Sequence, residues 1–246
     1  MKAPPTKAVG IDLTFWHPSF ERTADYSFLS GVYQLDLSIP VSDKLNIVAG
    51  IPFSVWSPDQ GDTEQGFGNL FAGAQTQSSD TTGLRASATF GVALPTASED
   101  ESSNALLALF TNYHYTHLYI PNRVTIIANG TWYNRPLKGG FYGFEFGARI
   151  WIPTKSDDDV EMILNYGGNG GVALDPVAIS LELVGQFLLS SEADSFSDKF
   201  FHTLSFGLEW TRGPFKPSLF YSLYLEEALT NYVNGVLGIR LRYDLE

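Results

Sequence analysis

Near the end of the chain, Leu237-Gly238-Ile239-Arg240-Leu241-Arg242-Tyr243-Asp244-Leu245 alternates between apolar side chains and charged or small ones. Successive side chains of a β-strand point to opposite faces, so this segment would form a strand with one apolar and one charged face. A half-buried strand of a soluble sheet has the same alternation. Here the pattern recurs along most of the 246 residues, with few helical interruptions. The repetition predicts a closed barrel with lipid outside and polar groups inside.

Thirteen segments qualify as strands on this two-residue period. They are residues 9–16, 29–39, 45–56, 67–75, 84–94, 109–120, 124–133, 141–152, 160–174, 177–189, 201–211, 218–226 and 233–245. A single-chain bacterial barrel has an even number of strands, so one segment must be something else. The weakest segments are 67–75 and 109–120, and residues 104–110 would also fit a short helix in a loop.

We therefore predict an all-β fold in which residues 1–246 form a single transmembrane antiparallel up-and-down β-barrel domain. Twelve strands are expected, and fourteen are the alternative. The connections support a barrel because short links such as 40–44 and 120–123 alternate with longer polar loops such as 57–65 and 96–104.

All five tryptophans, Trp16, Trp56, Trp132, Trp151 and Trp210, lie within a few residues of a predicted strand end. Transmembrane barrels carry aromatic girdles at this level, where the strands cross the boundary between lipid and water. We therefore expect the tryptophans to mark that boundary.

Composition narrows the class of protein further. The formal net charge of −12 argues against nucleic acid as a partner, because phosphate binding needs a basic surface. No apolar run reaches the roughly 18 residues of a membrane-spanning helix. No signal peptide is visible at residues 1–5, so we expect a mature exported form with an added methionine. The expected location is the bacterial outer membrane, with lipid and lipopolysaccharide around the barrel.

The sequence predicts no catalytic residue, cofactor or metal site. His114 and His117 would point to opposite faces of a strand and could not share a metal ion. The run 157–159 of three aspartates favours a solvated turn over a calcium site. His17 and Ser19 have a His-x-Ser spacing found in some outer-membrane lipid hydrolases. A Ser–His pair also needs an orienting carboxylate, and no second motif element accompanies this one.

Charged and aromatic residues on the polar phase of the strands would point into the lumen. The charged candidates are Asp36, Arg85, Glu145, Arg149, Glu161, Glu182, Glu209, Arg240 and Arg242. The aromatic candidates are Phe71, Phe110, Tyr133, Trp151, Phe220 and Tyr224. Dehydrated charges must be paired or wetted, so the first group forms either an internal salt-bridge network or a charged channel lining. The aromatic group would form a ligand pocket or plug-like packing. A one-residue slip in register would invert every assignment.

Short motifs in the first half of the chain resemble a known family. Residues 33–40 lead through a turn to a strand ending in Ile51-Pro52-Phe53, and Gly66-Phe67-Gly68-Asn69 and Leu94-Pro95-Thr96 follow. This order is similar to that of the outer-membrane channels and transporters assigned to phenol-degradation pathways. In that family an Asp occupies the position of Asn69, and a Gly occupies that of Ala97. The resemblance implies a barrel near twelve strands that passes or binds small hydrophobic or aromatic compounds.

Together these observations predict an outer-membrane channel or transporter of a Gram-negative bacterium, not an enzyme. Its expected role is passive or facilitated uptake of small, hydrophobic or aromatic solutes. The alternatives are a structural or binding barrel that transports nothing and a lipid hydrolase using His17 and Ser19. At the level of the fold, the rival is a soluble barrel.

Overall fold

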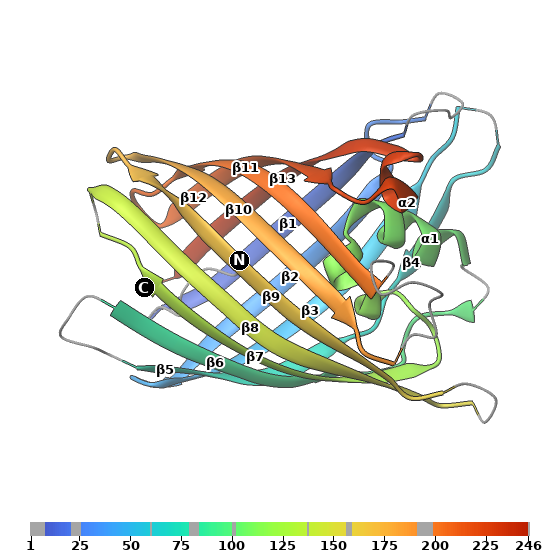
Figure 1. The fold of residues 1–246 in the computed structure, drawn as a ribbon, viewed down its shortest axis with the longest axis horizontal. Coiled ribbons are helices and arrows are strands. Elements are labelled where there is room, and N and C mark those ends of the chain that lie inside the picture. Colours follow the sequence, from blue (N-terminus) through green and yellow to red (C-terminus); the bar gives the residue numbers. More distant parts are fainter. Residues whose placement is uncertain are drawn as a thin grey trace.

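The structure is a computed structural model that describes residues 8–20, 26–59, 61–78, 84–99, 102–136, 138–155, 159–190 and 199–245, with only the backbone of 102–104. Twelve antiparallel strands form a closed barrel (Figure 1). They are β1 (Val9–Phe20), β2 (Gly31–Ser42), β3 (Leu45–Trp56), β5 (Phe71–Ser78), β6 (Leu84–Ala93), β7 (Arg123–Asn134), β8 (Gly139–Pro153), β9 (Glu161–Ala173), β10 (Val177–Leu188), β11 (Phe200–Trp210), β12 (Phe215–Tyr224) and β13 (Val233–Leu245). Pairing of β1 with β13 and of β2 with β3 closes the ring.

The predicted strand number is confirmed, and the surplus segment is residues 109–120. These residues belong to helix α1 (Ser102–Thr111) and the 3-10 helix η2 (Tyr113–Leu118), so the expectation of a short helix at 104–110 is confirmed and that of a strand is wrong. The segment 67–75 is shifted, because β4 (Glu64–Phe67) pairs with the end of β3 before the chain enters β5.

The connections at the two ends of the barrel differ in length, as predicted, but the expected short link at 120–123 is wrong because residues 120–122 end the long connection between β6 and β7. Two residues separate Ser42 of β2 from Leu45 of β3, whereas 29 residues separate Ala93 of β6 from Arg123 of β7. We call the end with the short links the turn end and the other the loop end. The loop end carries α1, η2, β4 and the short helix α2 (Glu227–Thr230) (Figure 1). Within the described ranges, no helix is long and apolar enough to cross a membrane.

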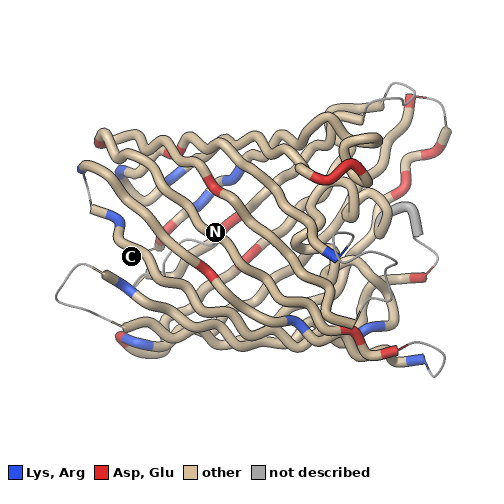
Figure 2. The backbone as a smooth tube through the Cα atoms, viewed as in Figure 1, with Lys and Arg blue, Asp and Glu red and all other residues tan. Residues whose placement is uncertain are grey.

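The two faces of the strands differ in polarity as the alternation predicts. On β13, Leu241 and Tyr243 face outward and are 39% and 43% exposed, whereas Arg242 and Asp244 face inward and are both 7% exposed. Charged residues are sparse along the middle of the barrel and more frequent toward its ends (Figure 2). An apolar exterior of this extent on a closed barrel is suited to contact with lipid.

The tryptophans follow the expected girdle only in part. Trp132 and Trp210 face outward near the turn end, but Trp16, Trp56 and Trp151 are on the inward phase. Residues near strand ends also fill the lumen, so proximity to a strand end does not decide which face a side chain occupies.

Other rings form the outer aromatic surface near the loop end. Phe15, Tyr33 and Phe53 stack across β1, β2 and β3 with ring centroids 4.6 Å apart at each step. Phe67 of β4 continues the row at 6.4 Å.

An ion-pair network holds the seam between the first and last strands. Arg240 Nε donates to Asp12 Oδ1 over 2.8 Å, and Arg242 Nε donates to Asp244 Oδ1 over 2.8 Å. Lys216 Nζ of β12 lies 2.6 Å from Asp244, and Arg242 lies 3.7 Å from Asp12. The salt-bridge alternative raised for the inward charges is therefore realised at this seam.

We expect Asp12→Asn to lower the free energy of unfolding by about 1–3 kcal/mol, because it leaves two largely buried guanidinium groups with less counter-charge. Denaturant titration in detergent micelles, followed by tryptophan fluorescence, measures the change. Asp43→Asn, in the exposed turn between β2 and β3, is the control and should have little effect. Equal stability of the Asp12 variant and the wild type would show that the seam does not depend on these charges.

Candidate functional site

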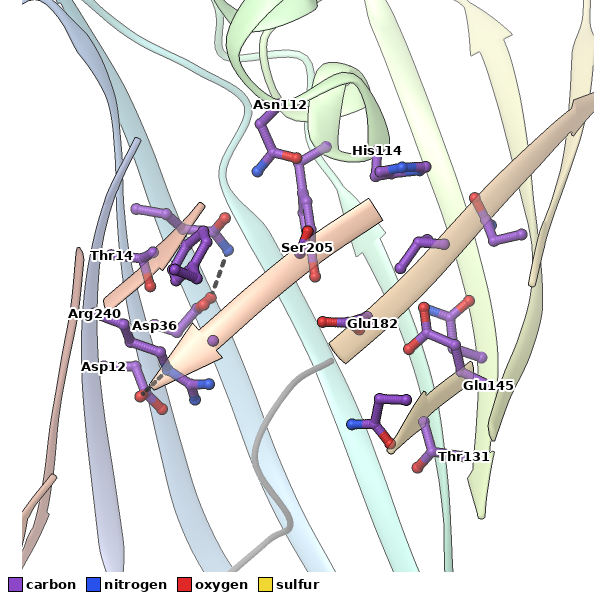
Figure 3. Close-up of a pocket in the computed structure, with 18 of the residues that line it drawn as sticks. Asp12, Thr14, Asp36, Asn112, His114, Thr131, Glu145, Glu182, Ser205 and Arg240 are labelled. Atoms are coloured by element: carbon purple, nitrogen blue, oxygen red, sulfur yellow. Dashed lines mark hydrogen bonds and ion pairs between the residues drawn. The ribbon is translucent and has the colours of Figure 1, made fainter. Parts of the chain in front are cut away.

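The lumen of the barrel contains a cavity of about 360 Å³. Small polar side chains from many strands line its middle, and Thr14, Thr131 and Ser205 are among those that point into it (Figure 3). They lie on the inward phase of β1, β7 and β11, where alternation places the polar residues of each strand. The cavity wall is therefore assembled from one face of nearly the whole sheet.

Five carboxylate residues also line this cavity: Asp12, Asp36, Glu145, Glu182 and Glu209. Asp36 of β2 accepts a hydrogen bond of 2.8 Å from the side-chain amide of Gln34. Glu145 of β8 and Glu182 of β10 lie on the other side of the lumen (Figure 3). Gly167 of β9 faces Glu145, and a Cβ atom there would lie only 3.1 Å from Glu145 Cγ. The glycine leaves room for the glutamate side chain beside β9.

The connection between β6 and β7 folds into the loop end and narrows it. We call residues 102–120, which comprise α1, η2 and the two residues after η2, the inner loop (Figure 1). Its side chains Leu107, Ala108 and Leu118 pack with Val32 and Phe71 of the wall in one buried apolar cluster. The inner loop is thus part of the core and not a mobile appendage.

The wall of β8 to β11 contacts the inner loop through polar groups. The carbonyl oxygen of His114 accepts hydrogen bonds from Arg149 Nη1 and, over 3.3 Å, from Gln186 Nε2. The His114 imidazole lies 2.9 Å from Thr203 Oγ1. Burial, with a further contribution from the Arg149 charge, lowers the pKa of His114 to about 3, so the ring is neutral at pH 7. Across the lumen, Tyr119 donates to the carbonyl of Tyr33 over 3.0 Å.

Asn69 fixes the far end of the inner loop and is fully buried. Its backbone N–H donates to Leu118 O over 2.5 Å, and its side-chain amide donates to Ile120 O over 2.7 Å and to His117 O over 3.1 Å. Close approach requires the preceding Gly68, because a Cβ atom there would lie 2.2 Å from Leu118 O.

The three short motifs of the first half meet at this point. The side-chain oxygen of Asn69 accepts from Ala97 N over 2.9 Å, and Thr96 Oγ1 donates to Gly68 O over 2.9 Å. Gly68 N in turn donates to Pro52 O over 2.9 Å. The motifs therefore form one hydrogen-bond network that holds the inner loop against the barrel wall.

Most of the predicted lumen residues line the cavity. They are Asp36, Glu145, Arg149, Glu182, Glu209, Arg240 and Arg242 among the charged residues and Phe71, Tyr133, Phe220 and Tyr224 among the aromatic ones.

Four predicted lumen residues lie outside the cavity, and three of them, Arg85, Glu161 and Trp151, are still on the inward phase of their strands near the barrel ends. Arg85 is exposed on β6, where it pairs in register with Tyr133 near the turn end. Glu161 forms an ion pair with Arg123, whose guanidinium also lies 5.7 Å from the centroid of the Trp151 ring.

The prediction that Phe110 points inward from a strand is wrong. It lies on α1 and packs against Phe20 and Tyr232. The strand pattern failed here because the inner loop is apolar for its own burial inside the barrel.

Uncharged polar residues were the ones that sequence reasoning missed. Asn165, Gln186 and Thr203 are all buried, and all contact the inner loop or one another. The alternation of the strands predicts that these residues point inward. Nothing in the sequence, however, indicates that they contact the inner loop whereas other polar lumen residues do not. For Asn69 a signal existed, since it is the last residue of the motif Gly66-Phe67-Gly68-Asn69.

The hydrolase arrangement receives no support from geometry. His17 is on the outward phase, and its Nδ1 atom lies 2.8 Å from the carbonyl oxygen of Ser30. Among the described residues no hydrogen bond joins His17 to Ser19. In the same part of the chain that the structure describes, no group of three or more His, Asp or Glu side chains could hold a metal ion.

No protein-family model and no curated protein sequence matches the chain. Among solved structures, it is similar to the COG4313 outer membrane channel from Pseudomonas putida F1, with 17% identity, a TM-score of 0.66 and coverage of 99% of this chain and 97% of that one. It is also similar to the KdgM porin (9% identity) and the NanC porin (8% identity), each with a TM-score of 0.56 and coverage of 97% of this chain and 100% of the other. The chain therefore has the fold of an outer-membrane channel barrel.

We expect Asn69→Asp to loosen the inner loop, because a carboxylate would face two carbonyl oxygens to which the amide now donates. Limited chymotrypsin digestion in detergent should then cut the tyrosine-rich segment 113–119 faster than in the wild type. Asn46→Asp is the control, because Asn46 is equally buried on β3 but bonds to Ser38 and not to the inner loop. Unchanged digestion of the Asn69 variant would contradict the anchoring role.

Proposed function

We propose that this protein is a channel of the bacterial outer membrane that lets small solutes cross without chemical change. The observation that carries the proposal is the cavity of about 360 Å³, lined by both polar and apolar side chains, inside a closed barrel whose exterior is apolar. Similarity in fold to solved channels and porins adds support. Lipid and lipopolysaccharide would surround the exterior, and the solute would be the only ligand.

The channel would select among solutes at the level where the inner loop narrows the lumen. Trp16, Tyr113 and Tyr115 line the cavity there, and the Trp16 ring lies 6.3 Å from that of Tyr115. Farther toward the turn end, hydroxyl, amide and carboxylate groups dominate. We infer that the preferred solutes are small and carry an aromatic or apolar part, in keeping with the family resemblance.

A sealed barrel that transports nothing is the second candidate, and the dense packing of the inner loop favours it. The two candidates differ in permeability alone. In planar bilayers the purified protein should give discrete current steps, and in liposomes it should admit small solutes faster than large ones. A folded protein with no current and no flux would establish the sealed barrel.

The inner loop also gives the channel a dependence on acid. His114 has a pKa of about 3 in place, against about 6.5 for an imidazole in water. The neutral ring therefore stabilises the packed position of the inner loop fully above pH 6.5, and this contribution is lost as the pH falls from 6.5 toward 3. Protonation places a second positive charge beside Arg149.

Acidification from pH 7 to pH 4 should therefore raise the open fraction of the channel. His114→Gln should abolish most of the rise, because its amide can still bond to Thr203 but does not titrate. His17→Gln, on the outer face, should keep the wild-type response. The measurement is single-channel conductance against pH, and an identical acid response in the His114 variant would exclude this residue as the cause.

A further inference from the structure

Arg149 is a buried cation without a bonded carboxylate among the described residues. Arg149 is 6% exposed, and it donates a hydrogen bond to His114 O and lies against the ring of Tyr115, whose centroid is 5.7 Å from its Cζ atom. Glu145, four residues away on the same strand, attracts the Arg149 charge through space, but no ion pair or hydrogen bond joins the two described side chains. The inward arginines of the seam differ, because Arg240 and Arg242 are each hydrogen-bonded to an aspartate.

Arg149 and Gln186 share one hydrogen-bond acceptor. Gln186 Nε2 donates to the same carbonyl as Arg149, that of His114, and also to Asn165 Oδ1 over 3.0 Å. Arg149 and Gln186 therefore meet at one carbonyl oxygen, and Gln186 links that point to Asn165. The acceptors in the group are thus shared, while several N–H groups remain.

Two of the remaining donors are buried and have no acceptor among the described residues. They are Arg149 Nε and Asn165 Nδ2. Asn165 is 5% exposed, and both residues line the lumen cavity. A buried polar group without a partner is costly, and a buried charge without a counter-charge more so, which points to a group that the lumen receives from solution.

We propose that Arg149 and Asn165 form a subsite for the anionic oxygen group, a carboxylate or a phosphate, of a small solute in the lumen. The planar guanidinium presents its donors as a fork that matches such oxygens, and the Asn165 amide supplies a further donor beside it. This inference deepens the proposed function by naming a substrate class. Binding at the subsite does not, however, require the barrel to conduct.

Isothermal titration calorimetry on the full-length protein in detergent tests the proposal with three probes. Benzoate and inorganic phosphate carry the anionic group, and benzyl alcohol is the neutral relative of benzoate. Benzoate should bind at least about tenfold more tightly than benzyl alcohol, and phosphate decides whether the anion alone suffices. Equal affinity for benzoate and benzyl alcohol, or binding of no anion, would overturn the proposal.

A pair of isosteric variants locates the site. Asn165→Asp keeps an oxygen that can accept from Gln186 but removes the N–H donor of the amide. The new carboxylate also gives Arg149 a counter-charge within the protein. The variant should therefore bind the anions at least about tenfold more weakly. Asn169→Asp adds the same charge four residues farther along β9, where the side chain also lines the cavity, and should weaken binding much less. Equal losses in both variants would show a general charge effect and refute the subsite.

The outcome is separable from that of the channel proposal. Anion binding in a protein that carries no current would refute the channel and leave the subsite. Current with no anion binding would refute the subsite and leave the channel.

Discussion

The structure depends on one constraint, which is that backbone N–H and C=O groups in lipid must all be paired within the protein. A sheet satisfies this constraint only when its two edge strands pair with each other, so β1 must pair with β13 from the other end of the chain. In this barrel the joining strands are also held by Asp12, Arg240 and Arg242 on their inner face. Closure separates the two faces completely, so that each strand presents apolar residues to the outside and polar residues to the lumen.

The lumen that closure creates must be filled with water, with protein chain or with both. The inner loop takes the loop end, and its two sides make different contacts. Toward β2, β3 and β5 it packs in an apolar cluster and is pinned by Asn69. Toward β8 to β11 it meets Arg149 and Gln186 through a single carbonyl, and buried donors there are left over. The side toward β2, β3 and β5 is therefore apolar and tightly anchored. The side toward β8 to β11 is polar and has hydrogen-bond donors without acceptors, so a water-filled path fits better there.

The fold was predictable because lipid imposes a period of two on every wall strand, and that period can be read without any knowledge of tertiary contacts. The inner loop was harder to predict. Its apolar residues, such as Leu109 and Phe110, belong to a helix inside the barrel, but their pattern in the sequence resembles that of a strand. Only the rule that such a barrel has an even number of strands showed that one of the thirteen candidate segments was not a strand. Predicted lumen residues reached the cavity where the strand phase was right, as for Glu145. The roles of Asn69 and Asn165 depend on which carbonyl or side chain lies opposite, and a single sequence does not contain that information.

The order of charges along the lumen bears on how a bound anion would leave again. From the loop end, an anion would meet Arg149 before Glu145, which lies nearer the turn end on the same strand. A channel needs sites that are favourable enough to enter and weak enough to leave, and a cation followed by carboxylates provides both. Exposed acidic residues at the mouth, such as Asp59 and Asp62, oppose entry little, because exposed charges are screened beyond about 8 Å at physiological salt. The buried guanidinium is screened much less, so it would dominate the field that an anion meets beside the inner loop.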